Sequence, residues 1–195
     1  MKIILASRSG VRKKILDKYK IDSDVIVSNV DEDQIKESLL AEQATPLIIS
    51  KNLAELKSVS VSRKNPDRLV LGADSVISLD NKLINKPKNR KEALEILKSL
   101  NNSIHFLISS VCISKNGSML WNHSDQSELR MKNFQEKELI NYLNKIDTKT
   151  LLAYGVYQIE ASGFGLFEYV KGNQDSIMGL PVQEIINYIK LIHRK

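Results

Sequence analysis

Hydrophobic and polar positions recur with two different periods along the chain, and these periods predict an alternating series of strands and helices. A short apolar run at residues 2–6 predicts a buried strand. Val11, Ile15 and Tyr19 then recur at helical spacing, so a helix is expected to start near Ser9. The chain therefore passes from its first strand into its first helix within a few residues.

Four further segments have the apolar stripe of an amphipathic helix. In the first of them, Thr45 is a good N-cap residue and Pro46 suits the first helical position. Ile49, Leu53 and Leu56 are expected to form the buried stripe of that helix. The four expected helices cover residues 45–61, 89–101, 135–146 and 181–193.

The remaining regular segments have the composition and alternation of strands. Asp80-Asn81 and Asn116-Gly117 are typical of tight turns between strands. Strand and helix signals alternate first and hairpins follow, which favours a mixed α/β sheet in a single domain over residues 1–195. The expected strand regions are residues 23–33, 68–80, 103–115, 118–132 and the passage 155–173.

Composition places the chain among ordinary globular proteins. Of its 195 residues, 42% are apolar, which is enough for a substantial core. Its single cysteine, Cys112, excludes a disulfide within the chain and alternates with apolar neighbours, so it is expected in the core. No segment approaches membrane-spanning length, and a cytoplasmic protein without a membrane partner is expected.

The net charge of +6 fits two classes of anionic partner. One is nucleic acid, and the other is a small polyanion bound in a pocket. The acidic residues are interspersed among the basic ones, which weakens the nucleic-acid interpretation, so no nucleic-acid partner is expected.

Hydroxyls and positive charge gather where the first strand meets the first helix. Ser7, Ser9, Arg12, Lys13 and Lys14 lie at this junction. The first amides of a helix lack intrahelical partners and its dipole favours anions, so such a junction suits phosphate. The alternative is a capped helix with a solvated basic face. The glycine-rich P-loop pattern does not occur in the chain.

Carboxylates occur at the end of one expected strand and in the middle of another. Asp31, Glu32 and Asp33 follow one strand, and Asp74 interrupts a strongly apolar one. Two carboxylate sites beside basic residues are what Mg²⁺-assisted phosphoryl chemistry requires. The alternatives are a solvated turn at residues 31–33 and a strand-end turn residue at Asp74. Gly72 is expected to let another group approach the strand backbone.

Two lysines complete the candidate site. Lys57 lies on the second expected helix, and Lys86 lies between a turn and a proline. Each alone is most often a surface lysine. A role in phosphate binding depends on both facing the same site as Asp74.

Seven stretches together resemble one family, in order and in approximate spacing over nearly the whole chain. They are LASRSGVRKKIL, VDED, LAELK, LGADSV, NKP, GVYQIEASGFGLFE and GLP. In these stretches the chain resembles the Maf family of nucleoside triphosphate pyrophosphatases. The resemblance implies an α/β fold of the Maf/ITPase type: an elongated mixed β-sheet with flanking helices and two lobes around a central cleft. A homodimer is compatible with it.

The resemblance also implies an activity and residue roles. Members hydrolyse nucleoside triphosphates to the monophosphate and pyrophosphate with a divalent metal, Mg²⁺ or Mn²⁺. Asp74 matches the aspartate taken as proton acceptor, and Glu32 matches an acidic residue near the metal. Both carboxylates are expected to bind the metal. The residues that match the groups holding the triphosphate are Ser7, Ser9, Arg12, Lys57 and Lys86.

The chain departs from the family pattern at positions linked to base choice. Gly10 replaces a usual proline, and Val11 replaces a common arginine or tryptophan. Ser75 follows Asp74, and Glu160 occupies the place of a glutamine in the pyrimidine-preferring branch. The run GVYQIEASGFGLFE instead resembles the branch associated with 7-methyl-GTP. Val11, Ser75 and Glu160 are therefore the expected specificity residues.

A non-catalytic function is the alternative. Part of the family is linked to inhibition of septum formation, so a regulator that binds a nucleotide or nucleic acid is the second hypothesis. The pair Asp74 and Glu32 favours catalysis, because a simple polyanion binder gains nothing from carboxylates beside the phosphates.

If Glu160 contacts the base, the variant Glu160→Gln should change the preference among nucleotides. Relative rates of pyrophosphate release across a panel of nucleoside triphosphates measure this preference. Unchanged ratios would remove Glu160 from the specificity residues.

Overall fold

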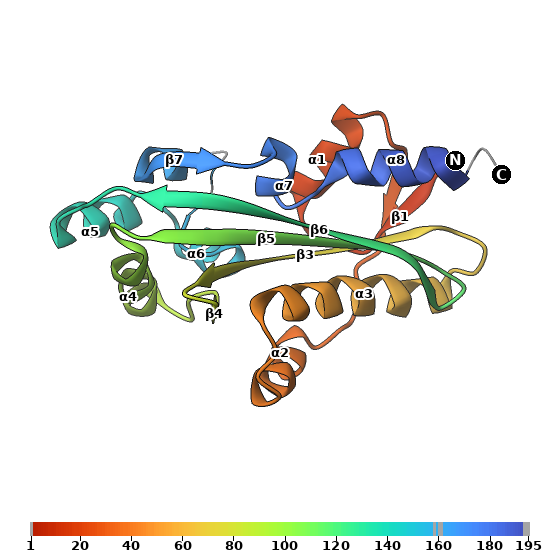
Figure 1. Cartoon of the computed structure of the whole chain (residues 1–195), viewed down its shortest axis with the longest axis horizontal. Coiled ribbons are helices and arrows are strands. Elements are labelled where there is room, and N and C mark those ends of the chain that lie inside the picture. Colours follow the sequence, from red (N-terminus) through yellow and green to blue (C-terminus); the bar gives the residue numbers. More distant parts are fainter. Residues whose placement is uncertain (1, 158, 160–161, 193–195) are drawn as a thin grey trace. The chain divides into compact units, whose positions relative to one another are not determined.

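A mixed sheet of seven strands organises the part of the chain that the computed structural model describes, residues 2–157, 159 and 162–192. The strand order is β2-β1-β3-β5-β6-β7, with β4 paired to β3 off this path. Strand β1 is parallel to β2 and β3, whereas β4 and β7 run antiparallel to their neighbours β3 and β6. The expected α/β class with flanking helices is confirmed (Figure 1).

The longer elements follow the predicted alternation, but the strand expected over residues 23–33 is shorter, since β2 ends at Val25. The strands are β1 (Ile3–Leu5), β2 (Ser23–Val25), β3 (Val70–Leu79), β4 (Lys82–Ile84), β5 (Ile104–Lys115), β6 (Ser118–Met131) and β7 (Phe167–Lys171). The helices are α1 (Gly10–Lys18), α2 (Glu32–Ala41), α3 (Pro46–Lys64), α4 (Arg90–Leu100), α5 (Glu136–Asn144), α6 (Thr148–Tyr154), the 3-10 helix η1 (Ser162–Leu166), α7 (Gln174–Ile177) and α8 (Val182–Ile192). No helix among the described residues is both long enough and apolar enough to cross a membrane.

The chain divides into two compact units. The first comprises Met1–Val76, Ile108–Gln126 and Asn173–Lys195, and the second comprises Ile77–Leu107 and Ser127–Gly172. In the second unit, α4, α5, α6, η1 and β7 contribute to one apolar core that includes Leu97, Leu129 and Phe167. The expected single domain and the expected cleft between lobes stay predictions.

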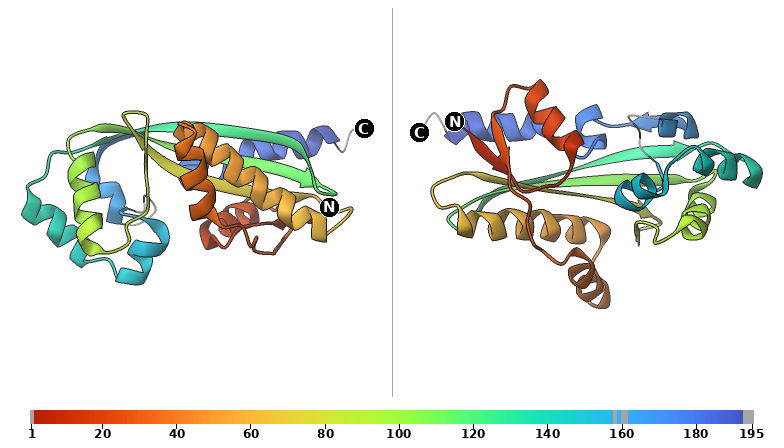
Figure 2. Two further views of the ribbon diagram at one scale, coloured as in Figure 1. Left: turned by 90° about the horizontal axis from the view of Figure 1, so that it is seen from below. Right: turned by 180° about the vertical axis from the view of Figure 1, so that it is seen from behind.

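Helices cover both faces of the strands in the first unit. Helices α1 and α8 lie on one face and α3 lies on the other, as two opposite views show (Figures 1 and 2). Leu5 and Leu71, which are partners across β1 and β3, belong to the core that includes residues of α1 and α8. Their neighbours Ile4 and Val70 pack with Val61 of α3. This period of two sends Asp74 toward α3 and Ser75 toward α1.

Three sequence-based expectations are corrected by the structure. Asp31–Asp33 do not form a solvated turn but begin the helix α2. Asp31 is its N-cap, and its carboxylate accepts a hydrogen bond from the backbone N–H of Gln34 at 3.1 Å. Glu32 and Asp33 occupy the first turn, where acidic side chains interact favourably with the helix dipole. Leu56 is 39% exposed and does not belong to the buried stripe of α3. Five elements were not expected at all: the ten-residue helix α2 and the short elements β4, α6, η1 and α7.

Gly72 permits the closest approach between β3 and α3. A Cβ at this position would lie 2.1 Å from the Ala54 carbonyl oxygen and 2.7 Å from the Ser58 backbone nitrogen. Both are backbone atoms of a helix, so they cannot move aside independently. The expected close approach of another group to Gly72 is confirmed, and that group is the α3 backbone.

The variant Gly72→Ala should lower the free energy of unfolding by about 3 kcal/mol, at the upper end of the cost of overpacking, because α3 must shift away from β3. Urea denaturation followed by circular dichroism measures the loss. The matched control is Gly10→Ala, since nothing lies within 4 Å of a Cβ there. Equal stability of the two variants would contradict the packing argument.

Candidate functional site

The segment between β1 and α1 carries two serines whose hydroxyls organise the start of the helix. Ser9 is the N-cap of α1, and its Oγ accepts a hydrogen bond from the backbone N–H of Arg12 at 3.3 Å. The buried Ser7 accepts one at its Oγ from the backbone N–H of Ser9 at 3.2 Å. The interpretation of this junction as a helix cap therefore holds for Ser9, while phosphate binding by both serines stays a prediction.

Arg12 joins three distant parts of the chain. Its Nε donates a hydrogen bond to the Gly179 carbonyl oxygen at 2.9 Å, and its Nη1 donates one to the Ala73 carbonyl oxygen at 2.8 Å. Nη1 also donates to Ser7 Oγ at 3.0 Å, and Nη2 donates to Ser75 Oγ at 3.1 Å. These bonds occupy most of the five N–H donors of the guanidinium. Arg12 therefore acts as a clamp: its hydrogen bonds hold α1, β3 and the turn before α8 together.

The guanidinium of Arg12 donates its hydrogen bonds to neutral oxygen atoms, two carbonyls and two hydroxyls. Burial lowers the pKa of Arg12, while the nearby carboxylates of Asp74 and Glu32 act on that pKa in the opposite direction. Since the ordinary pKa of arginine lies so high, the guanidinium stays protonated at neutral pH. The positive charge at the start of α1 and the two carboxylates therefore influence one another electrostatically.

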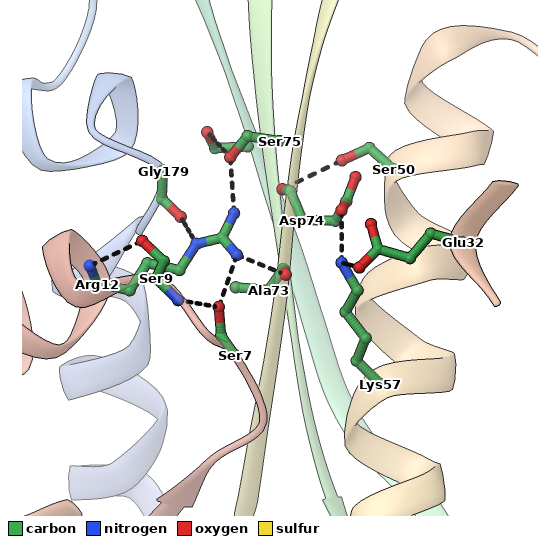
Figure 3. Close-up of polar contacts among 11 residues, drawn as sticks. Ser7, Ser9, Arg12, Glu32, Ser50, Lys57, Ala73, Asp74, Ser75 and Gly179 are labelled. Atoms are coloured by element: carbon green, nitrogen blue, oxygen red, sulfur yellow. Dashed lines mark hydrogen bonds and ion pairs between the residues drawn. The ribbon is translucent and has the colours of Figure 1, made fainter. Parts of the chain in front are cut away.

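Lys57 lies between two carboxylates near β3, as Figure 3 shows. Its Nζ is 2.8 Å from Asp74 Oδ1 and 2.9 Å from Glu32 Oε1. The side chains of Lys57 and Asp74 are each 8% exposed, whereas that of Glu32 is 40% exposed. Burying charges is costly unless opposite charges lie at short range, so the three side chains depend on one another. We call Glu32, Lys57 and Asp74 the charge triad.

One atom of the charge triad is unsatisfied. Asp74 Oδ2 is buried and has no hydrogen-bond partner among the described residues. Almost all buried polar atoms in proteins find a partner, so an exception calls for a specific explanation, such as a bound water or ion. Asp74 Oδ2 is therefore the triad atom with capacity for a further ligand.

The β3 segment Ala73–Ser75 is held from both faces of the sheet. From the α3 side, Ser50 Oγ donates a hydrogen bond to the Asp74 carbonyl oxygen at 3.3 Å. From the α1 side, Arg12 donates hydrogen bonds to Ala73 and Ser75 (Figure 3). Ser75 Oγ also lies 3.0 Å from Ser109 Oγ of β5. The carboxylate of Asp74 is thus carried on a backbone segment fixed at three consecutive residues.

The structure brings most of the expected site residues into two groups joined by this segment. The first group comprises Ser7, Ser9, Arg12 and Ser75, and the second is the charge triad. Val11 packs against the hydrophobic core of the first unit. Lys86 is exposed between β4 and α4 in the second unit, and Glu160 lies outside the described residues.

Three residues of this arrangement were missed from the sequence. Ser50 and Ser109 are fully or almost fully buried serines within a helix and a strand, and nothing in their local sequence distinguishes them from other serines. Gly179 has a φ of +94°, a backbone conformation that favours glycine, and offers its carbonyl oxygen to Arg12. The stretch GLP was the available signal for Gly179.

The donor set of the charge triad is compatible with Mg²⁺ or Mn²⁺. Both ions prefer oxygen ligands, and Mg²⁺ is usually held by one or two carboxylates together with substrate phosphates. No group of three or more histidine, cysteine or acidic side chains suited to a metal occurs within the described ranges. Glu32 and Asp74 are therefore the two carboxylates that could hold such an ion, with further ligands supplied by a bound phosphate compound.

Comparison with known proteins gives matches over nearly the full length. Residues 2–192 match the family model described as Maf-like protein. A nucleoside triphosphate pyrophosphatase of Pelagibacter ubique (strain HTCC1062) is 60% identical over 190 residues, 97% of this chain and 97% of that protein. One of Ruegeria sp. (strain TM1040) is 37% identical, covering 97% and 95%. A 7-methyl-GTP pyrophosphatase of Brucella abortus biovar 1 (strain 9-941) is 30% identical, covering 95% and 94%.

The variant Arg12→Ala should lower the free energy of unfolding by about 3 kcal/mol, the scale of one or two hydrogen bonds to a charged group, because two backbone carbonyls lose their donor. Arg12→Lys should restore only part of this loss, since an ammonium cannot reproduce the planar fork. Urea denaturation measures both. Lys14→Ala, at an exposed position of α1, is the control. Wild-type stability of Arg12→Ala, combined with weaker nucleotide binding, would instead make Arg12 a phosphate ligand and not a clamp.

Proposed function

We propose that this chain, which belongs to the family of Maf-like proteins, hydrolyses nucleoside triphosphates to nucleoside monophosphate and pyrophosphate. The names of its relatives support the activity, since proteins 60% and 37% identical to it are called nucleoside triphosphate pyrophosphatases. The structural observation that carries the proposal is the buried carboxylate of Asp74, which is paired at Oδ1 with Lys57 and unpartnered at Oδ2.

In the proposed reaction, a water oxygen attacks the α-phosphorus of the nucleotide. A new bond forms between phosphorus and the water oxygen, and the bond from that phosphorus to the bridging oxygen of the β-phosphate breaks. Asp74 Oδ2 accepts the proton of the water, because it is the triad oxygen that no protein group occupies. The backbone of β3 is fixed by Ser50 and Arg12, and this keeps the carboxylate of Asp74 in place.

The start of α1 is the proposed place of the negatively charged phosphates. Its first amides have no intrahelical partner, and its dipole favours anions. Gly10 is exposed and has open space around the position of a Cβ, so a ligand can approach the backbone there. Ser7, Ser9 and the remaining N–H of Arg12 are the nearby donors, and Lys86 is proposed as a further phosphate ligand on the resemblance.

A divalent metal, Mg²⁺ or Mn²⁺, is the proposed cofactor. Glu32 and Asp74 would hold it, and when bound it would offset negative charge on the phosphate oxygens. The residues of this chain keep their roles beside it: the α1 start binds phosphate, and Asp74 takes the proton.

Modified or non-canonical nucleotides, such as 7-methyl-GTP, are the proposed substrates. A relative of this chain bears the name 7-methyl-GTP pyrophosphatase, and the run GVYQIEASGFGLFE supports the same branch. Of the three proposed specificity residues, Ser75 already contacts Arg12 and Ser109, and the partly buried Val11 packs against the core. Glu160, which lies outside the described residues, stays a proposed specificity residue on the resemblance alone.

The variant Asp74→Asn should lower the rate of pyrophosphate release at least about 100-fold, as expected for loss of a general base, while nucleotide binding persists. Enzymatic detection of pyrophosphate across a nucleotide panel with Mg²⁺ measures the rate, and calorimetry measures binding. The control is Asp33→Asn, at an exposed position in α2.

Two outcomes would contradict the proposal. Release of inorganic phosphate and a diphosphate would place the attack at the terminal phosphate. Nucleotide binding by the wild-type protein without turnover under any divalent metal would instead favour the nucleotide-binding regulator.

A further inference from the structure

Lys57 occupies an unusual position for a lysine on a helix. Its side chain is 8% exposed, on the same buried face of α3 as Leu53, Ala54 and Val61. A lysine stem packs readily on apolar surface, but its ammonium normally reaches water. In this chain the ammonium ends instead at two carboxylate oxygens, 2.8 Å from Asp74 and 2.9 Å from Glu32.

The ammonium bridges the two carboxylates that are the proposed ligands of the metal. Asp74 Oδ1 and Glu32 Oε1 both direct their negative charge at one Nζ atom (Figure 3). A divalent cation that joined the same two carboxylates would stand next to this buried positive charge and be repelled by it. The charge triad has two negative charges and one positive charge, so its net charge is a single negative one. A divalent cation is therefore attracted less strongly than by two carboxylates alone.

The unpartnered Asp74 Oδ2 is a second, independent observation that indicates a ligand at this site. Asp74 is 6% exposed, and this oxygen has no partner among the described residues. Attraction to the ammonium offsets the cost of burying the carboxylates, so the triad can fold. Asp74 Oδ1 and Glu32 Oε1 become available to a cation once the ammonium binds another anion, while Oδ2 remains for the attacking water.

We propose that Lys57 is an internal counter-ion that keeps divalent cations off Glu32 and Asp74 until a nucleotide binds. Triphosphate oxygens supply the ammonium with a new anionic partner, and the two carboxylates then accept the metal. The ligand that the site takes is thus the complex of a divalent cation with a triphosphate, and free cation binds weakly. The inference rests on the proposed metal-assisted function and adds an order of binding to it.

The test is a titration of the protein with Mn²⁺ in the absence of nucleotide, with free Mn²⁺ measured by electron paramagnetic resonance. In the variant Lys57→Met, which keeps the length and apolar stem, the affinity for Mn²⁺ should rise at least about ten-fold over wild type, because the repelling charge is gone. The control Lys51→Met changes an exposed lysine of the same helix and should bind Mn²⁺ as the wild type does. Adding Glu32→Gln to Lys57→Met should abolish the gain.

The unaltered protein provides a second measurement that does not depend on any variant folding. With a non-hydrolysable α,β-methylene nucleotide present, wild-type affinity for Mn²⁺, corrected for binding to the nucleotide alone, should rise at least about ten-fold. Wild-type protein that binds Mn²⁺ equally well with and without the analogue would overturn the proposal. A folded Lys57→Met variant with unchanged or weaker Mn²⁺ affinity would also overturn it.

These measurements are separate from the test of the activity, since none of them requires turnover. If the Mn²⁺ affinities change as expected and the wild-type protein releases no pyrophosphate, the role of Lys57 stands and the proposed hydrolysis fails. If pyrophosphate is released and Mn²⁺ binds equally with and without the analogue, the hydrolysis stands and the role of Lys57 fails.

Discussion

The close packing of α3 on β3 at Gly72 is the contact on which the rest of the site depends. Only hydrogen at this position allows the Ala54 carbonyl to approach as it does, since a Cβ would lie 2.1 Å away. With the helix at this distance, Ser50 reaches the Asp74 carbonyl oxygen and Lys57 reaches its carboxylate. One missing methyl group in the strand thus sets the position of two polar groups about one helical turn to either side of Ala54.

The electrostatics of the site follow from that packing. A helix lying so close to a strand excludes water from the facing side chains, so Asp74 and Lys57 must satisfy each other. Glu32 joins them because Asp31 caps α2 and places the next residue in the first helical turn. The resulting triad is compact, mutually dependent and incompletely satisfied, which is a reasonable starting condition for a site that accepts a charged ligand.

The opposite face of β3 is organised by a different kind of interaction. Arg12 donates to two backbone carbonyls and two serine hydroxyls, so it stabilises the junction of α1, β3 and the turn at Gly179 through neutral acceptors. The same arginine that resembles a family phosphate ligand is therefore already engaged by the protein. Its hydrogen bonds make the start of α1 a fixed surface, which is what an anion site at a helix terminus requires.

Local sequence patterns were sufficient to predict the longer helices and strands, with the exception of α2, and the chemical types of the site residues. Thr45 with Pro46 marked the start of α3, Asn116-Gly117 marked the β5–β6 hairpin, and the apolar periods marked the helices, because these signals act over a few neighbouring residues. The tertiary structure alone decided that Lys57 is buried between Glu32 and Asp74 and that Arg12 is bound by Ala73 and Gly179. The physical reason is that charge pairing and desolvation depend on distances between residues far apart in the chain, and no local period encodes those distances.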